Sequence, residues 1–133
     1  MAHTRINPPA LFDSTRYGFS QVVVATGRRT VYCSGQVAWD ADEDIGSADM
    51  GAQARRALAN VERAVAAAGG GLADVVSLRL YIVRQGEGDT RAIREALLAA
   101  FPADAQPATT WIAVAGLANP DFAIEIEAIA VLD

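Results

Sequence analysis

Two residue pairs near the C-terminus have types and spacings that allow chemistry. Glu125 and Glu127 are two residues apart in an apolar run, so a strand there presents both carboxylates on one face, where each disfavours ionisation of the other. A carboxylate whose pKa is raised can act as a general base. Thr109 and Trp111 also share one strand face, and an indole offers ring stacking, cation–π attraction and one N–H donor. These pairs predict a site for a planar or cationic ligand, and the alternative is solvated glutamates with a tryptophan that packs at a subunit interface.

The composition excludes several other kinds of site. All 11 basic residues are arginine, so the chain has no lysine for a Schiff base or for a phosphate-binding loop. Cys33 and His3 are the only cysteine and histidine, which excludes an internal disulfide and a histidine metal cluster. We therefore predict no metal site. The net charge of −5 repels polyphosphates, so nucleic acid is not an expected partner.

Length and hydropathy predict one domain spanning residues 1–133. The chain is 52% hydrophobic and 20% charged, a balance typical of globular proteins. No apolar run approaches the ~20 residues needed to cross a bilayer, and the N-terminus lacks the pattern of a secretory signal. We therefore expect a cytoplasmic protein with no membrane partner.

The first half of the chain predicts two strands and a helix. Residues 20–25 and 30–34 are β-branched and aromatic runs on either side of a turn, which is typical of an antiparallel hairpin. Residues 40–49 are acidic and aperiodic, and this expected loop ends at Asp49, a good helix N-cap. Apolar residues then recur at steps of three and four until the glycines at 69–71 end the helix. These apolar residues are Ala54, Ala57, Leu58, Val61, Val65 and Ala68.

The second half predicts a strand, a helix and two more strands. Residues 75–83 alternate in a strand whose strongly apolar face carries Val76, Leu78, Leu80 and Ile82. Asp89 is expected to cap the second helix, which ends near Phe101. Residues 108–115 and 124–132 form the last two expected strands.

The resulting order, ββαβαββ, predicts an α+β fold. Each helix has one apolar stripe to bury, so both helices are expected on one face of a mixed sheet. The other sheet face then has no cover from the chain itself. We expect association with further copies of the chain to supply that cover.

Several short motifs resemble those of the RidA/YjgF family, in the same order and at matching spacing over nearly the whole chain. They are Tyr17, Ser34-Gly35-Gln36, Gln53-Ala54, Leu58 to Val61, Ala67-Ala68-Gly69, Phe101, Pro107-Ala108 and Glu125 to Ala130. The resemblance implies a chorismate-mutase-like subunit, a homotrimer whose sheets form a central barrel, and small-molecule clefts at the subunit interfaces. It also implies hydrolysis of 2-imino acids to 2-oxo acids and ammonia without a cofactor.

The resemblance further implies where the site lies. Glu125 matches the family glutamate that helps to hold the attacking water, and Glu127 on the same strand face is a further candidate for ligand binding. Tyr17 matches a tyrosine that lines the cleft, whereas Ser34 and Gly35 match a strand end beside it. The alternatives are solvated glutamates, a phenol that anchors the N-terminal segment, and a strand-end turn.

The chain departs from the family at the residue that binds the substrate carboxylate. Deaminating members have an arginine at this position, because a guanidinium binds a carboxylate through two hydrogen bonds. This sequence has Thr109 there instead. Trp111, two residues on, is expected to narrow the cleft. Arg94, which aligns with an asparagine of the family, is our first choice for a substitute. The other arginines considered for this role are Arg16, Arg28 and Arg79.

Three functions follow as hypotheses. The first is a cofactor-free hydrolase or deaminase acting on an imine, an enamine or another small metabolite, with classical 2-imino acid deamination not expected because of Thr109. The second is a non-catalytic homotrimer that binds a small metabolite or a protein through the same clefts. An endoribonuclease, an activity attached to some family members, fits least, because acid–base cleavage of RNA usually needs histidines and a basic surface.

Overall fold

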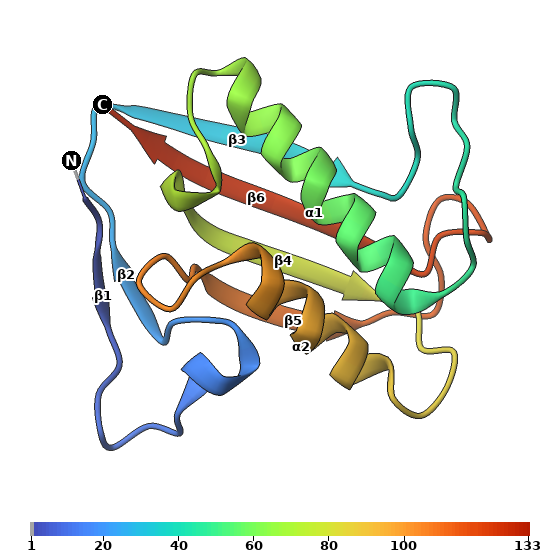
Figure 1. The fold of residues 1–133 in the computed structure, drawn as a ribbon, viewed down its shortest axis with the longest axis horizontal. Coiled ribbons are helices and arrows are strands. Elements are labelled where there is room, and N and C mark those ends of the chain that lie inside the picture. Colours follow the sequence, from blue (N-terminus) through green and yellow to red (C-terminus); the bar gives the residue numbers. More distant parts are fainter. Residues whose placement is uncertain (1) are drawn as a thin grey trace.

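A four-stranded mixed sheet with two helices on one face forms the body of the protein (Figure 1). The computed structural model describes residues 2–133. The sheet order is β3-β6-β4-β5, and a separate two-stranded ribbon joins β1 to β2. The predicted α+β class, with both helices on one side of a mixed sheet, is confirmed. The elements are β1 (Thr4–Ile6), η1 (Ser14–Tyr17), β2 (Val22–Val24), β3 (Arg29–Gln36), α1 (Met50–Ala67), η2 (Leu72–Asp74), β4 (Val75–Ile82), α2 (Asp89–Ala100), β5 (Ala108–Ala113) and β6 (Ile124–Leu132).

Helix α1 begins and ends at the residues that its sequence predicts. The Asp49 carboxylate accepts a hydrogen bond from the amide of Ala52, which satisfies a free N–H group of the first turn. Just after the helix, Gly69 has a φ of 94°, a left-handed conformation that glycine adopts without steric cost. The apolar stripe is buried against the sheet from Ala54 to Val65.

The central strand β6 separates a buried sheet face from an open one. Its residues alternate along the whole strand, with Ile124 and Ile126 among those fully buried beneath the helices. The intervening residues, which include Glu125 and Glu127, point to the opposite face and stay partly exposed. No helix of residues 2–133 covers that face (Figure 1), so the polar and partly apolar side chains of β3, β4 and β6 remain accessible there.

The predicted hairpin between residues 20–25 and 30–34 is wrong. Strand β2 pairs with β1, which the sequence did not predict, whereas β3 pairs antiparallel with β6. The intervening turn is bonded to other segments, because the amide of Arg28 donates to Leu132 O at 2.8 Å and that of Thr26 donates to His3 Nδ1 at 3.1 Å. The turn therefore carries the chain from the ribbon to the sheet.

Three further details differ from the predictions. Strand β5 ends at Ala113 rather than at residue 115. Gly88, not Asp89, is the N-cap of α2, and the Asp89 carboxylate instead accepts from the amides of Gln85 and Gly86 in the preceding loop. In β4 the register shifts between residues 75 and 77, so Val75 is fully buried in place of Val76.

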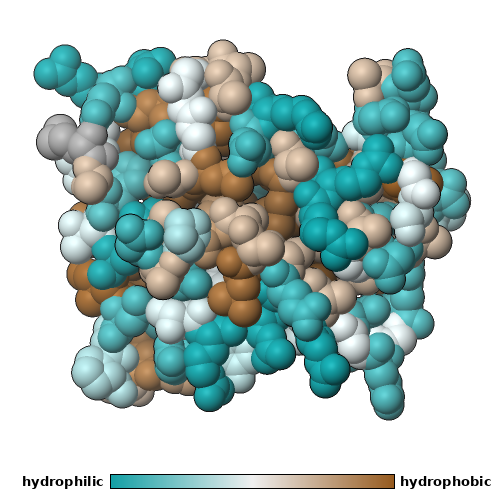
Figure 2. Space-filling view, in the orientation of Figure 1, coloured by the Kyte–Doolittle hydropathy of each residue, from teal (hydrophilic) through white to brown (hydrophobic). Residues whose placement is uncertain are grey.

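Gln53 ties α1 to the loops at one end of the sheet. Its buried amide nitrogen donates to Ser47 O and Asp121 O, each at 2.9 Å, and its oxygen accepts from the amide of Ala123 at 2.8 Å. All three partners are backbone groups, which rarely stay unpaired when they are buried. On the helical face, apolar surface gathers around the helices while hydrophilic side chains cover most of the periphery (Figure 2).

Candidate functional site

The predicted site residues lie on the two opposite faces of the sheet. In the parallel pairing of β4 with β5, Thr109 lies beside Leu78 and Trp111 beside Leu80, and both leucines are buried under the helices. In the antiparallel pairing of β4 with β6, Glu125 lies beside Tyr81 on the open face. One protomer therefore holds two half-sites, which we call the open-face half-site and the helix-face half-site.

The open-face half-site is centred on Glu125 and Gly35. Strand β3 shifts register between Cys33 and Gln36, so Ser34 and Gly35 together stand opposite one residue of β6. The Glu125 carboxylate occupies the space next to the Gly35 backbone, where any side chain on residue 35 would overlap it. Within residues 2–133 this carboxylate has no protein hydrogen bond or ion pair, so it is free to bind water or a ligand.

Glu125 lies in a shallow hollow of about 270 Å³. Two of its neighbours there, Tyr81 and Glu127, are engaged with each other, since Tyr81 Oη donates to Glu127 Oε1 at 2.5 Å. The lining residues are Gly35, Tyr81, Leu117, Glu125 and Glu127. The two glutamates thus share a face, as predicted, but have different surroundings.

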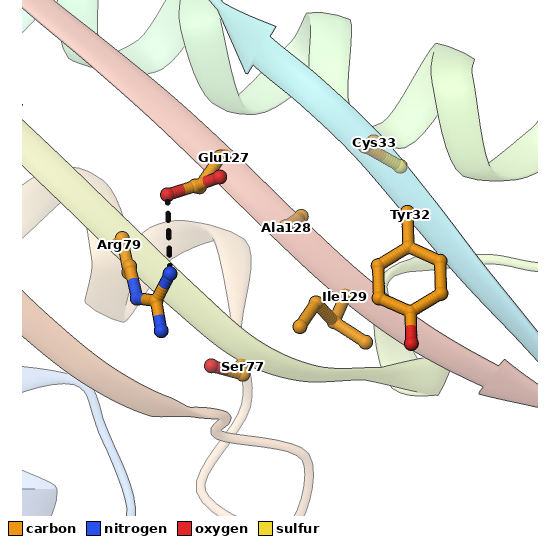
Figure 3. Close-up of a pocket in the computed structure, with 7 residues that line it drawn as sticks. All are labelled: Tyr32, Cys33, Ser77, Arg79, Glu127, Ala128 and Ile129. Carbon is orange, nitrogen blue, oxygen red and sulfur yellow. Dashed lines mark ion pairs between the residues drawn. The ribbon is translucent and has the colours of Figure 1, made fainter.

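Glu127 is held by two neighbours on β4. Besides the bond from Tyr81, Arg79 Nη1 lies 3.6 Å from Glu127 Oε1, as the dashed line in Figure 3 marks. The hydrogen bond to the Glu127 carboxylate is the main reason that the pKa of Tyr81 is raised above its ordinary value. Glu127 is therefore partly neutralised and oriented before any ligand arrives.

A second hollow lies further along the open face, between β3, β6 and β4 (Figure 3). Tyr32 and Ile129 are neighbours in the β3–β6 pairing, and Tyr32 is 78% exposed. Cys33 points into the core instead, and burial raises the pKa of its thiol, which disfavours the reactive thiolate. The one thiol that borders this hollow is therefore not an activated nucleophile.

The helix-face half-site is built around Trp111. Its indole Nε1 donates to Thr109 Oγ1 at 3.1 Å, so the residue that replaces the family arginine is bonded to the tryptophan. The Trp111 ring packs partly into the core and lies 6.3 Å from the ring of Phe19. Phe12 completes an aromatic row, with its ring 6.1 Å from Phe19 and 6.2 Å from Tyr17.

A short helical turn places Tyr17 beside α2. Asp13 caps this turn by accepting from the amide of Thr15 at 3.1 Å. Gly18 ends it with a φ of 93° and packs so closely on α2 that a Cβ there would lie 2.7 Å from Leu97 Cβ. The close packing brings Tyr17 within reach of Arg94 on the same helix.

Two guanidinium groups approach the Tyr17 ring. The Cζ of Arg16 lies 5.3 Å from the ring centroid and that of Arg94 lies 5.8 Å from it, both within the range of cation–π attraction. Arg16 also donates from Nη2 to Tyr17 Oη at 3.1 Å. The predicted substitute clamp, Arg94, thus lies in the same half-site as Thr109 and Trp111.

Three residues of these half-sites were not predicted as site residues: Phe12, Phe19 and Tyr81. The aromatic spacing around Tyr17 and the alternation in residues 75–83 carried a signal for them. Arg16 was one of the arginines considered as a substitute for the family clamp. His3, in contrast, is buried in the ribbon, where its Nδ1 accepts from the Thr26 amide. Residues 2–133 bring no three His, Cys, Asp or Glu side chains into a group that could hold a metal ion. Neither α1 nor α2, the α-helices of that part of the chain, has the length and apolar content that a bilayer crossing requires.

The chain is similar to proteins of one family over most of its length. The family model for endoribonuclease L-PSP matches residues 13–132. The mitochondrial protein mmf1 of Schizosaccharomyces pombe is 30% identical over 129 residues, which cover 96% of this chain and 75% of mmf1.

Solved structures show the same fold. YyfB from Yersinia pestis, a member of the conserved Rid protein family, is 38% identical, with a TM-score of 0.93 over 99% of this chain and 100% of YyfB. TdcF of E. coli, whose structure contains bound serine, is 29% identical, with a TM-score of 0.69 over 82% of this chain and 94% of TdcF.

Proposed function

The chain belongs to the endoribonuclease L-PSP family, which includes the Rid proteins, and from this premise we propose that it is a homotrimeric, cofactor-free hydrolase of a small imine- or enamine-like metabolite. Each cleft would combine the open-face half-site of one protomer with the helix-face half-site of the next. The expected cytoplasmic location remains part of this proposal.

The proposed reaction adds water across a C=N bond. The water oxygen forms a bond to the imine carbon, the Glu125 carboxylate accepts one water proton, and the imine nitrogen takes up a proton. The carbinolamine nitrogen then takes the proton held by Glu125, and the hydroxyl group loses its proton to solvent as the C–N bond breaks, a C=O bond forms and ammonia leaves. Imine and water thus give a carbonyl compound and ammonia. No electrons are transferred to or from another molecule, so the reaction needs no redox cofactor.

One observation carries the proposal: the free Glu125 carboxylate and the Thr109–Trp111 pair lie on opposite faces of the same sheet. A ligand that touches both half-sites needs a second copy of the chain. Closed symmetric oligomers supply such repeated contacts, and in a trimer three equivalent clefts result.

Mixing two inactive variants tests both the cleft and the chemistry. Glu125→Gln removes the base and Trp111→Ala alters the other half-site, so each variant alone should lose imine hydrolysis. In trimers co-assembled from equal amounts, about a quarter of the clefts combine two intact half-sites, and activity should return to about a quarter of the wild-type value. Failure of mixed trimers to recover any activity would contradict a cleft shared between protomers.

The substrate question is tested with imines generated in solution. An amino-acid-oxidising or eliminating enzyme supplies 2-iminopropanoate or 2-iminobutanoate, whose lifetime is followed with and without the protein. We expect little acceleration by the wild type and partial recovery in Thr109→Arg, because a guanidinium binds the substrate carboxylate. Acceleration by the wild type at the level of deaminating relatives would show that Thr109 does not abolish the usual activity.

A non-catalytic binding protein is the second candidate. It is favoured because Thr109, which stands where deaminating members have the arginine, is engaged in a hydrogen bond with Trp111. It predicts ligand binding that Glu125→Gln leaves intact, with no imine or enamine hydrolysed. Endoribonuclease activity fits least, because the chain has one histidine and a net charge of −5. RNA cleavage by highly purified protein that disappears in Glu125→Gln would establish it.

A further inference from the structure

From the helix-face half-site we infer a ligand class: an aromatic carboxylate whose ring lies against Phe12, Phe19 and Trp111 and whose acid group binds Arg16 and Arg94. Its assignment to a substrate rests on the proposed function, whereas the binding itself does not. If the protein is a hydrolase, the substrate is then an imine or enamine that carries both an aryl group and an acid group.

The aromatic row supplies the surface for the ring. The side chains of Phe12, Tyr17, Phe19 and Trp111 line a hollow of about 360 Å³ together with Arg16 and Thr90. Successive rings stand tilted or edge-on to each other, with 6.1 to 6.3 Å between centroids. Such rings favour another planar ring, which can add an offset-stacked or edge-to-face contact.

The hydrogen bond from Trp111 to Thr109 determines which part of the indole a ligand in the hollow can contact. Its only N–H donor is used within the protein at 3.1 Å, so the ring offers its carbon face and edge to the hollow rather than a polar group. Phe12 is 62% exposed although it belongs to the row. An aromatic ligand would cover this exposed apolar ring.

The two guanidinium groups supply the charge. Arg16 and Arg94 both lie within 6 Å of the Tyr17 centroid, at 5.3 and 5.8 Å, and neither forms an ion pair with a carboxylate of the described chain. Two like charges near one ring, on a protein of net charge −5, form a local positive site. A carboxylate would neutralise this positive charge, and its oxygens would accept hydrogen bonds from the N–H groups of the planar guanidinium.

Binding of three small probes tests the inference by isothermal titration calorimetry on the intact protein. Phenylacetate has both recognised groups, phenylacetamide lacks the charge, and acetate lacks the ring. We expect phenylacetate to bind at least about tenfold more tightly than either of the others, because each comparison removes one contact. An advantage of less than tenfold over either probe overturns the inference.

Substitutions assign the two contacts. Arg94→Gln and Arg16→Gln should each weaken phenylacetate binding at least about fivefold and change phenylacetamide binding less than about twofold. Phe12→Ala, at an exposed residue whose loss leaves the core intact, should weaken both aromatic probes. Arg55→Gln, an exposed arginine on α1, is the matched control and should change neither. Phenylacetate binding that is unchanged in both arginine variants contradicts the assignment.

The binding and hydrolysis outcomes are separable. If phenylacetate binds as expected but no imine is hydrolysed, the proposed hydrolase function fails and the ligand class stands. If an imine or enamine is hydrolysed but phenylacetate shows no advantage, the ligand class fails and the hydrolase function stands.

Discussion

Glu125 fills the space that the absent side chain of Gly35 leaves on the open face of the sheet. The two residues lie on strands β6 and β3, and the register shift in β3 brings the Gly35 backbone under the glutamate. A methyl group on residue 35 would overlap the Glu125 carboxylate, which is the flexible end of its side chain. The glycine therefore determines where this carboxylate lies.

Gly35→Ala should displace the Glu125 carboxylate without unfolding the protein. The methyl group forces the side chain aside, so hydrolysis of the preferred imine should fall about 10- to 100-fold, approaching the loss in Glu125→Gln. The free energy of unfolding should change by less than about 1 kcal/mol, because the displaced group is flexible and partly exposed. Rate measurements with urea unfolding check both expectations. An unchanged rate in Gly35→Ala would show that the carboxylate position is unimportant.

The bond from Tyr81 to Glu127 should be visible in an alkaline titration. The carboxylate raises the pKa of Tyr81 because it stabilises the protonated phenol, so this bond contributes stability below the ordinary pKa of about 10 and loses it as pH rises through the raised value. Tyrosinate absorbance at 295 nm, corrected with Tyr81→Phe, measures the midpoint. Glu127→Gln should lower that midpoint, whereas the neighbouring substitution Glu125→Gln should not. Equal midpoints in Glu127→Gln and wild type would contradict the role of Glu127.

Gln53 should be the most costly polar side chain to remove. Gln53→Leu keeps the volume but leaves two backbone carbonyls and one backbone N–H without their partners. Since each unsatisfied buried group costs about 1 to 3 kcal/mol, the free energy of unfolding should fall by at least about 3 kcal/mol. Urea unfolding measures this change, with Gln85→Leu in an exposed loop as the control. A loss below about 1 kcal/mol would mean that water replaces these bonds.

The helices and the last strand could be predicted from sequence, whereas the N-terminal pairing could not. Periodicity and caps are local signals, and they correctly gave α1 and its end at the glycines. Strand β3 instead finds its partner in β6 at the other end of the chain, and β2 pairs with the three-residue strand β1. Local turn chemistry favours neighbours in sequence, so it could not reveal either pairing.

The site could be predicted in pairs but not as a whole. Because residues two apart in a strand lie on the same face of a sheet, the sequence correctly predicted that Glu125 shares a face with Glu127, and Thr109 with Trp111. It could not say that the two pairs take opposite sheet faces, because that depends on the register between strands. The approach of Arg94 to Tyr17 depends on how α2 packs against an irregular segment, for which the sequence has no periodic signal.

A comparison of Gly18→Ala with Gly69→Ala distinguishes the effect of backbone strain from that of close packing in the helix-face half-site. Both have left-handed φ angles, 93° and 94°, so alanine at either position is strained by about 1 kcal/mol. Only at Gly18 does the new methyl group also meet Leu97 of α2, whereas Gly69 has no heavy atom within 4 Å of the added Cβ. Gly18→Ala should therefore lower the free energy of unfolding by at least about 2 kcal/mol, against about 1 kcal/mol for Gly69→Ala.

The same comparison applies to ligand binding. Gly18→Ala moves the turn that carries Tyr17 away from α2, so it separates the Tyr17 ring from Arg94 and should weaken phenylacetate binding at least about fivefold. Gly69→Ala lies at the end of α1 and should leave that affinity unchanged. Calorimetry on both variants, at a temperature where each is folded by circular dichroism, measures the difference. Equal affinities in the two variants would show that the packing of Gly18 on Leu97 does not position the half-site.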